Sequence, residues 1–254
     1  MIDLELLEAS FFSMDEPVFY KLDGESSLMI YPVNVKDSML FLSCCNILSF
    51  NKNEINSIDV IKMSYLQFMI EYLLTEESNA KKLYYVLNLC LKMDNPRIYY
   101  DKEERKHYIV DEETGIVLNS NQFEDIRRII MYQNILGYDD TYVDSDLKKS
   151  IEQTKALKMA GLEPISLERK MAIITAHCGI SKKEQKEMTY RSHSLLFQEV
   201  CSEVEYMATK PIALYGGVGD KVEWIHRKVK GKFDDYFTSV NNIQNKLGNG
   251  VSSQ

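Results

Sequence analysis

The residue types that bind metal ions are present, but their spacing does not suit a metal site. The chain has four His and five Cys, and no His-x3-His or Cys-x2-Cys pair occurs. Cys44-Cys45 and His177-Cys178 are neighbours in sequence, so on a helix the two side chains of each pair point in different directions. The acidic stretch 139–146 lacks the Gly and Glu positions of a calcium loop. We therefore expect no metal ion.

The candidates for covalent or phosphate chemistry are equally incomplete. Cys178 and Cys201 are predicted to lie on apolar helical faces as buried thiols, without a base beside them. Gly216-Gly217-Val218-Gly219 is followed by Asp220 and Lys221, whereas a phosphate loop needs Gly-Lys-Ser/Thr. A flexible joint explains this stretch better. We predict no catalytic residue and no cofactor; a small enzyme with an unrecognised site is the alternative from another class.

The elements that would position a site are mostly helices. The chain has only five Pro and eleven Gly, which disfavours a turn-rich all-β fold. Asn121 with Glu124 is predicted to cap one helix, Gly179 to end another, and Pro211 to break the longest one. Apolar residues at helical spacing and cap signals predict helices at 35–50, 58–74, 79–93, 121–136, 147–160, 167–178, 182–188, 189–209 and within 221–247. The fold class predicted is mainly α, with a multi-helix, bundle-like body.

Two short β elements interrupt the helices. The turn Asp23-Gly24-Glu25 predicts an N-terminal hairpin. Three short apolar stretches at 98–100, 107–110 and 116–118, joined by polar turns, predict a small β-hairpin arm. Tyr108 or Ile109 should pack this arm against the helical body. Tyr99 and Tyr100 are candidate interface residues, because an exposed strand edge can dock a partner.

The pattern divides the chain into four segments. These are a hairpin with helices at 1–95, the β-hairpin arm at 96–120, a helical region at 121–215, and hinged C-terminal helices with a frayed tail at 216–254. The last segment is rich in apolar and aromatic residues, of which we select as candidate interface residues Trp224, Ile225, Phe233, Tyr236 and Phe237. The alternative is that this segment packs on the body as a small satellite core.

Bulk composition restricts the partners and the compartment. The net charge of −8 and the pI near 5.2 disfavour nucleic-acid binding. No apolar run approaches the roughly 18 residues of a membrane span. The start of the chain is acidic where a signal peptide would be basic, and the Cys number is odd, so reduced thiols in a cytoplasm are expected. The expected partners are therefore other proteins.

Residues 107–215 resemble a family of proteins from tailed bacteriophages of Gram-positive hosts. The resemblance rests on the order of several short stretches: His107-Tyr108-Ile109-Val110-Asp111-Glu112, Phe123-Glu124-Asp125-Ile126-Arg127-Arg128-Ile129-Ile130 with Gln133-Asn134, Pro164-Ile165-Ser166-Leu167-Glu168-Arg169-Lys170, Thr175-Ala176-His177-Cys178-Gly179 and Met188-Thr189-Tyr190-Arg191. Family members are described as tail assembly chaperones or as baseplate-hub and tail-morphogenesis proteins. The residues beyond Gly219 do not match the family.

The resemblance implies a non-enzymatic role. The family binds the tape-measure protein and tail subunits during tail morphogenesis, and it has no known catalytic residues to carry over. The implied partners are thus the tape-measure protein, tail-tube or baseplate subunits, and a second copy of the chain. The implied location is the cytoplasm of the bacterial host. The alternative within this family is a permanent baseplate or tail component, which would be found in the virion.

Overall fold

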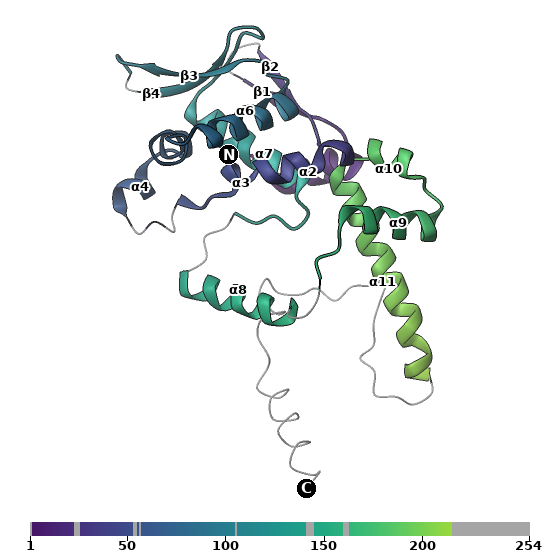
Figure 1. Ribbon diagram of the computed structural model, residues 1–254. Helices are drawn as coiled ribbons and strands as arrows, with labels where there is room; N and C mark the ends of the chain where they lie inside the picture. The colour runs from purple at the N-terminus through teal and green to yellow at the C-terminus, as the bar shows by residue number, and fades with distance from the viewer. Residues whose placement is uncertain are drawn as a thin grey trace. The chain divides into compact units, whose positions relative to one another are not determined.

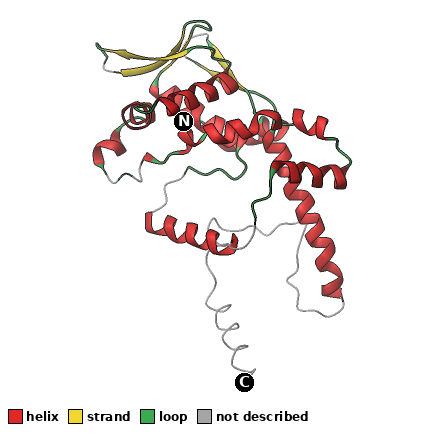
Figure 2. Cartoon of the chain, in the orientation of Figure 1, coloured by secondary structure: helices red, strands yellow, loops and turns green. Residues whose placement is uncertain are grey.

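The computed structural model describes residues 2–22, 26–52, 55, 57–104, 106–140, 145–159 and 163–214. Most of these residues are helical, and the strands form two small antiparallel sheets (Figure 1 and Figure 2). The prediction of a mainly α chain with small β elements is therefore confirmed. The chain divides into two compact units, Met1–Tyr142 with Ser166–Glu199, and Val143–Ile165 with Val200–Gln254.

The N-terminal elements are two short helical turns and a β-hairpin. Helix α1 (Leu4–Ser10) begins after Asp3, whose carboxylate accepts the Leu6 N–H at 3.0 Å, and the 3₁₀ turn η1 (Phe12–Met14) follows. Strands β1 (Val18–Lys21) and β2 (Ser27–Ile30) pair antiparallel. The predicted hairpin is therefore present, although its turn, residues 23–25, lies outside the described residues. Helix α1 was not predicted.

Two of the predicted helices are each divided in the structure. The segment 35–50 forms α2 (Val35–Cys44) and α3 (Asn46–Ser49), which meet at Cys45. The segment 58–74 forms α4 (Ile58–Lys62), α5 (Tyr65–Phe68) and the π-helical turn η3 (Met69–Leu73). The second division has a local cause. Met63 is extended, and the Ser64 hydroxyl accepts the Gln67 N–H at 3.1 Å, so Ser64 begins a new helix.

The middle of the chain forms one helix, a three-stranded sheet and a second helix. Helix α6 (Glu77–Leu91) leads into β3 (Pro96–Asp101), β4 (Lys106–Asp111) and β5 (Ile116–Leu118), in the order β3-β4-β5. Helix α7 (Ser120–Asn134) follows. Its cap is Asn119 with Gln122, not Asn121 with Glu124, because Asn119 Oδ1 accepts two backbone N–H groups and Gln122 Oε1 accepts the Asn119 N–H.

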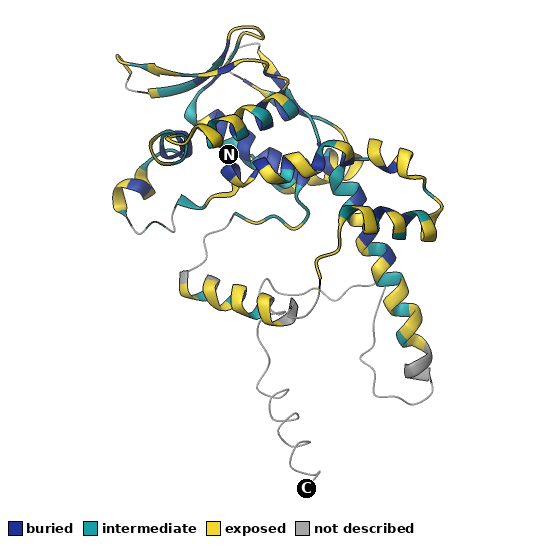
Figure 3. Ribbon diagram, in the orientation of Figure 1, coloured by how far each residue is buried: buried dark blue, intermediate teal, exposed yellow. Residues whose placement is uncertain are grey.

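The core of the first unit lies among α2, α3, α5, η3, α6 and α7, with the β1–β2 hairpin packed on it. Helix α6 packs on α2 and β2, and α7 packs on α5 and β4. Both helices bury one face: Leu83, Leu87 and Cys90 of α6, and Phe123 and Ile130 of α7 (Figure 3). The residues lie at helical spacing, so the amphipathic stripes in the sequence are the core-facing sides.

Helices α9 (Leu167–Cys178) and α10 (Lys182–Glu187) begin and end near the residues predicted, and α11 (Tyr190–Leu214) begins there. Gly179 ends α9 with a φ of +74°, a conformation that favours Gly over residues with a Cβ. The predicted break at Pro211 was wrong, since α11 continues to position 214. A proline near a helix end removes a single backbone hydrogen bond, which a 25-residue helix can lose.

The chain segments before α2 and α11 lie side by side. The Val35 N–H donates to the Met188 carbonyl at 2.9 Å, and the Tyr190 N–H donates to the Val33 carbonyl at 2.7 Å. At the end of α7, Asn134 Oδ1 accepts the Val33 N–H at 2.7 Å. These bonds join three parts of the chain that are far apart in sequence. In the second unit, helix α8 (Ser145–Met159) is mostly exposed where its side chains are described.

His193 makes the stability of the first unit depend on pH. Its ring is fully buried, and its Nε2 donates to Gln185 Oε1 at 3.1 Å because the Gln185 amide N–H groups are held by Met171, Thr175 and Ile180. Burial, and then the charge of Lys170, lower the pKa of His193 below its ordinary 6.5. As the pH falls, the His193 side chain of the unfolded protein therefore binds a proton at a higher pH than that of the folded protein does.

We expect the free energy of unfolding to be highest above pH 6.5 and to fall as the pH drops toward the lower folded-state pKa of His193. Urea unfolding at pH 7.5 and pH 5.5 measures this loss. The variant His193→Gln keeps a donor for Gln185 but does not titrate, so its loss should be smaller. Equal losses in the two proteins would show that His193 is not responsible.

The five thiols fall into two groups. Cys44, Cys45 and Cys90 are buried, and burial raises the pKa of Cys45 to about 11 and that of Cys90 to about 12. Cys178 and Cys201 are exposed, so the prediction that they are buried on apolar faces was wrong. Cys178 lies on the same face of α9 as the buried Met171 and Ile174, but it is the last residue of the helix.

A thiol reagent should distinguish these groups. In the native protein at pH 8 we expect fast reaction of Cys178 and Cys201 alone, because a buried thiol is both inaccessible and protonated. Unfolding in denaturant should release the other three without any reductant. The variant Cys178→Ser/Cys201→Ser is the control, and a fast phase that survives in it would contradict the assignment.

Candidate protein interface

Strands β3 and β4 form a hairpin that extends beyond the helices packed against its base (Figure 1). The pairing runs from Pro96 opposite Asp111 to Asp101 opposite Lys106. Residues opposite each other share a face, so Ile98 and Ile109 lie on the same face as Tyr100 and His107. This face is covered by the body at its inner end only.

The base of this β3–β4 arm is firmly anchored. Ile109 and Leu118, which pair across β4 and β5, are buried in the core, as predicted for Ile109. The buried Asp111 accepts the Asn95 N–H at 3.3 Å and the Thr114 hydroxyl at 2.7 Å, through different carboxylate oxygens. The Asp111 carboxylate therefore joins the segment before β3 to the turn between β4 and β5.

The outer half of the arm presents aromatic side chains to solvent. Tyr99 is 60% exposed and Tyr100 is 45% exposed. The Tyr100 ring lies 4.8 Å from the His107 ring between centroids, tilted by 41°. Because β3 is the outer strand in the order β3-β4-β5, its far edge faces no further strand of this sheet. Such an edge, with aromatic side chains on it, can accept a partner strand.

Glu104 orders the turn at the tip of the arm. The Lys106 ammonium and the Tyr108 hydroxyl donate to the same Glu104 oxygen at 3.0 and 3.1 Å. The hydrogen bond from Lys106 and then that from Tyr108 lower the pKa of Glu104. Asp101 accepts the N–H groups of Glu103 and Glu104 and so shapes the start of the turn.

A polar groove of about 470 Å³ lies at the inner side of β4. It is lined by Ser64 and Gln67 from the α5 region, by Lys106, His107 and Tyr108 from β4, and by Asn119, Ser120 and Asn121 at the start of α7. Its lining consists of hydrogen-bonding side chains. An amphipathic client helix would need an apolar groove, so this groove suits polar groups of a partner.

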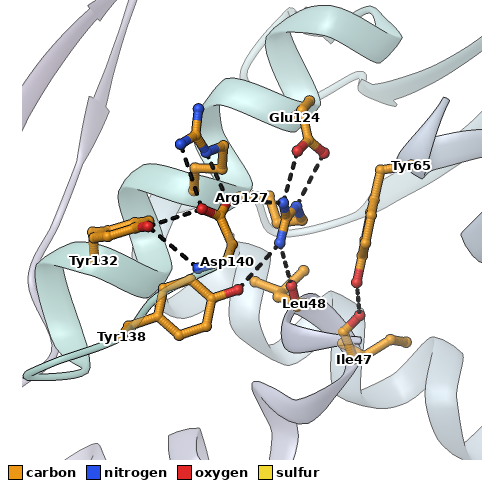
Figure 4. Close-up of polar contacts among 9 residues, drawn as sticks. Ile47, Leu48, Tyr65, Glu124, Arg127, Tyr132, Tyr138 and Asp140 are labelled. Carbon is orange, nitrogen blue, oxygen red and sulfur yellow. Dashed lines mark hydrogen bonds and ion pairs between the residues drawn. The ribbon is translucent and has the colours of Figure 1, made fainter. Parts of the chain in front are cut away.

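A buried arginine joins α7 to the two helices opposite it (Figure 4). Arg127 is only 6% exposed and forms a bidentate pair with Glu124, at 3.0 and 2.7 Å. It also donates to the Leu48 carbonyl at 2.7 Å and lies 4.3 Å above the Tyr65 ring. Burial opposes its charge, but the hydrogen bond and charge of Glu124 outweigh burial and raise the pKa of Arg127.

A second ion pair continues this cluster. Arg128 donates to Asp140 at 2.8 Å, and the Tyr132 hydroxyl donates to the other Asp140 oxygen at 2.8 Å. These contacts fix the segment that follows α7 against the helix (Figure 4). The guanidinium and carboxylate groups are satisfied within the protein, so the cluster is a structural support for α7 and, through it, for one wall of the groove.

The structure brings only part of the predicted site together. Tyr99 and Tyr100 lie on the arm, as predicted, and both side chains are exposed. The candidates Trp224, Ile225, Phe233, Tyr236 and Phe237 lie outside the described residues. The groove was missed, since its residues come from three separate segments. The buried ion pair of Arg127 was not predicted, although a charged residue on the apolar side of an amphipathic helix indicates such a pair.

Within the described part of the chain, His, Cys, Asp and Glu side chains do not gather in a group of three or more that could hold a metal ion. Of the helices formed by the described residues, none has the length and apolar character needed to cross a bilayer. Comparisons with protein-family models, with curated proteins and with solved structures found no match.

Proposed function

We propose that this protein is a non-enzymatic tail assembly chaperone of a tailed bacteriophage, which binds the tape-measure protein and tail subunits in the host cytoplasm. The resemblance of residues 107–215 to that family supplies the identity of the partners. The alternative is a permanent baseplate or tail component with the same binding surface.

The observation that carries the binding role is the exposed aromatic edge of the β3–β4 arm. Tyr99 and Tyr100 keep about half of their surface in solvent, whereas the base of the arm is buried. A rigid anchor with an aromatic tip holds the binding groups in place before the partner arrives, which reduces the entropy lost on binding. Tyrosine is also among the side chains enriched in interface hot spots.

Lys106 and Tyr108, two of the titratable side chains that line the groove, support a binding role over acid–base catalysis. The hydrogen bond to Glu104 raises the pKa of Lys106, and the same carboxylate raises the pKa of Tyr108. Both shifts move the pKa away from neutrality. A general acid or base instead needs a pKa near the working pH. Lys106 and Tyr108 therefore act as fixed charge and hydrogen-bond donors that order the arm.

The double variant Tyr99→Ser/Tyr100→Ser tests the arm. We expect it to retain the fold by circular dichroism but to lose co-purification with the co-expressed tape-measure protein, with binding reduced at least tenfold. The matched control is Phe19→Ser, because Phe19 is an equally exposed aromatic residue on the other hairpin. Undiminished binding by the double variant would remove the arm from the interface.

Mass spectrometry of purified phage particles separates the chaperone from the structural alternative. A chaperone leaves before the particle is complete, so its peptides should be missing from particles while they are present in the infected-cell lysate. Peptides at a level of several copies per particle would favour the baseplate or tail component.

A further inference from the structure

Strand β4 is longer than the strand that pairs with it on one of its two sides. On the β3 side the pairing covers the whole of β4, from Lys106 to Asp111. On the other side β5 pairs with residues 109–111, the inner half of β4. The outer half, Lys106-His107-Tyr108, extends past the end of β5. One edge of this stretch therefore lies beyond the last pair between β4 and β5.

The polar groove at β4 runs along this edge. Neighbouring side chains of a strand point to opposite faces of the sheet, so His107 points away from the face of Lys106 and Tyr108. All three residues nevertheless line the groove, together with residues 119–121, which follow β5 directly. A groove over one face would be lined by alternate residues of the strand. The groove thus lies beside β4, on the line that a longer β5 would follow.

The cap of α7 explains why β5 ends where it does. Asn119 is extended, with a φ of −79° and a ψ of 172°, and its Oδ1 accepts the N–H groups of Asn121 and Gln122 at 3.0 Å. The chain therefore enters helix α7 directly after β5 and does not continue beside Tyr108. The space that remains is about 470 Å³. A segment of three extended residues, roughly 10 Å long, matches the outer half of β4.

We propose that this groove binds a short extended segment of a partner protein, which adds to β4 as an antiparallel strand beside Lys106, His107 and Tyr108. Residues of a strand direct their N–H and C=O groups to its two edges in turn, so the stretch offers at least one such pair to the segment. Backbone pairing of this kind supplies affinity, and the surrounding side chains select the sequence. The groove lies on the opposite side of β4 from the exposed edge of β3, so it is a second binding site. The inference holds for any partner and does not rest on the function proposed above.

The lining of the groove favours a polar, acidic segment. Residues 119–121 contribute hydroxyl and amide groups, and among the described lining residues Lys106 is a cation and none is Asp or Glu. The Lys106 ammonium has three N–H donors, one of which donates to Glu104 at 3.0 Å. A carboxylate of the segment can accept one of the others. We therefore expect Asp or Glu at the position of the segment that faces Lys106.

Peptide titration of the isotope-labelled full-length protein, followed by NMR of its backbone amides, tests the strand addition. The probe is acetyl-Thr-Asp-Thr-Asp-Thr-amide, because Thr favours extended backbone. We expect saturable shifts that are largest at residues 106–108 and 119–121. The control peptide carries methyl groups on its three central backbone nitrogens, which keeps every side chain but removes N–H donors. It should bind about tenfold more weakly, as expected for the loss of one or two hydrogen bonds.

Two further comparisons test the charge and the place of binding. The peptide with Lys in place of Asp should bind about threefold more weakly, the preference expected of a partly exposed ion pair, and Lys106→Gln should remove this difference. Equal affinities of the two peptides for the unaltered protein would contradict an acidic segment. The variant Asn121→Tyr should block binding, because the larger side chain fills part of the groove. The matched control is Asn46→Tyr, an exposed Asn in the first turn of α3, which should bind the probe normally.

Four results would overturn the site itself. Equal affinity of the methylated peptide would show that no strand is added, and the absence of saturable shifts at residues 106–108 would show that no segment binds there. Largest shifts at residues 97–100 would place the probe on β3 instead. Shifts at 106–108 that depend on protein concentration without peptide would show that a second copy of the chain occupies the groove. Circular dichroism shows that each variant is folded before titration.

Discussion

The variant Phe68→Ala is expected to lose about 4 kcal/mol of unfolding free energy, which is typical of a large aromatic side chain removed from a core. Phe68 is fully buried. Its ring stacks between Phe50, at 5.6 Å, and Tyr72, at 5.4 Å, and meets the edge of Tyr65 at 6.1 Å between centroids. Truncation leaves a cavity and removes three aromatic contacts at once.

Chemical denaturation followed by circular dichroism measures the effect. The control is Phe19→Ala, where the ring is 60% exposed and we expect a change within about 0.5 kcal/mol. Phe68 adjoins Gln67, which lines the groove, so the variant should also weaken any partner that binds there. A loss below about 1 kcal/mol for Phe68→Ala would mean that Phe50 and Tyr72 close over the gap.

The second large effect is expected for Arg127→Ala, at about 3 kcal/mol, the lower end of the range for breaking a buried ion pair. The variant leaves the Leu48 carbonyl without its donor and Glu124 without its partner, and it removes the cation above the Tyr65 ring. Arg127→Lys should recover little of the loss, because an ammonium group cannot form the bidentate pair and reach Leu48 as well.

The control for charge alone is Lys81→Ala. Lys81 pairs with Glu77 one turn away on the exposed surface of α6, and such pairs contribute roughly 0.3–0.5 kcal/mol. If Arg127→Ala and Lys81→Ala change the unfolding free energy equally, the buried cluster around Arg127 does not support α7. The same denaturation experiment measures both variants.

Much of the local structure could be predicted from the sequence, because helices and hairpins depend on spacing and caps among neighbouring residues. Ser181 with Glu184, and Gly179 at the end of α9, act through contacts within four residues. The hairpin of Tyr99, Tyr100 and Tyr108 follows from alternating residues and polar turns. Two local predictions were wrong. Asn119 and Asn121 are both suitable helix caps, and the structure uses Asn119. The apolar residues at 58–74 continue at helical spacing past Ser64, although Ser64 caps a new helix.

The tertiary structure alone decided which side chains meet. Arg127 and Leu48 are 79 residues apart in sequence, and the groove joins Ser64 to Lys106 and Asn121. No local pattern encodes such contacts, since they depend on how helices pack after they form. Burial of thiols was likewise decided by packing: Cys90 faces the core, and Cys178 and Cys201 do not, although all three lie on helices with apolar stripes. A stripe predicts which face of a helix is buried, but which residues at its margin are covered depends on the neighbouring helix.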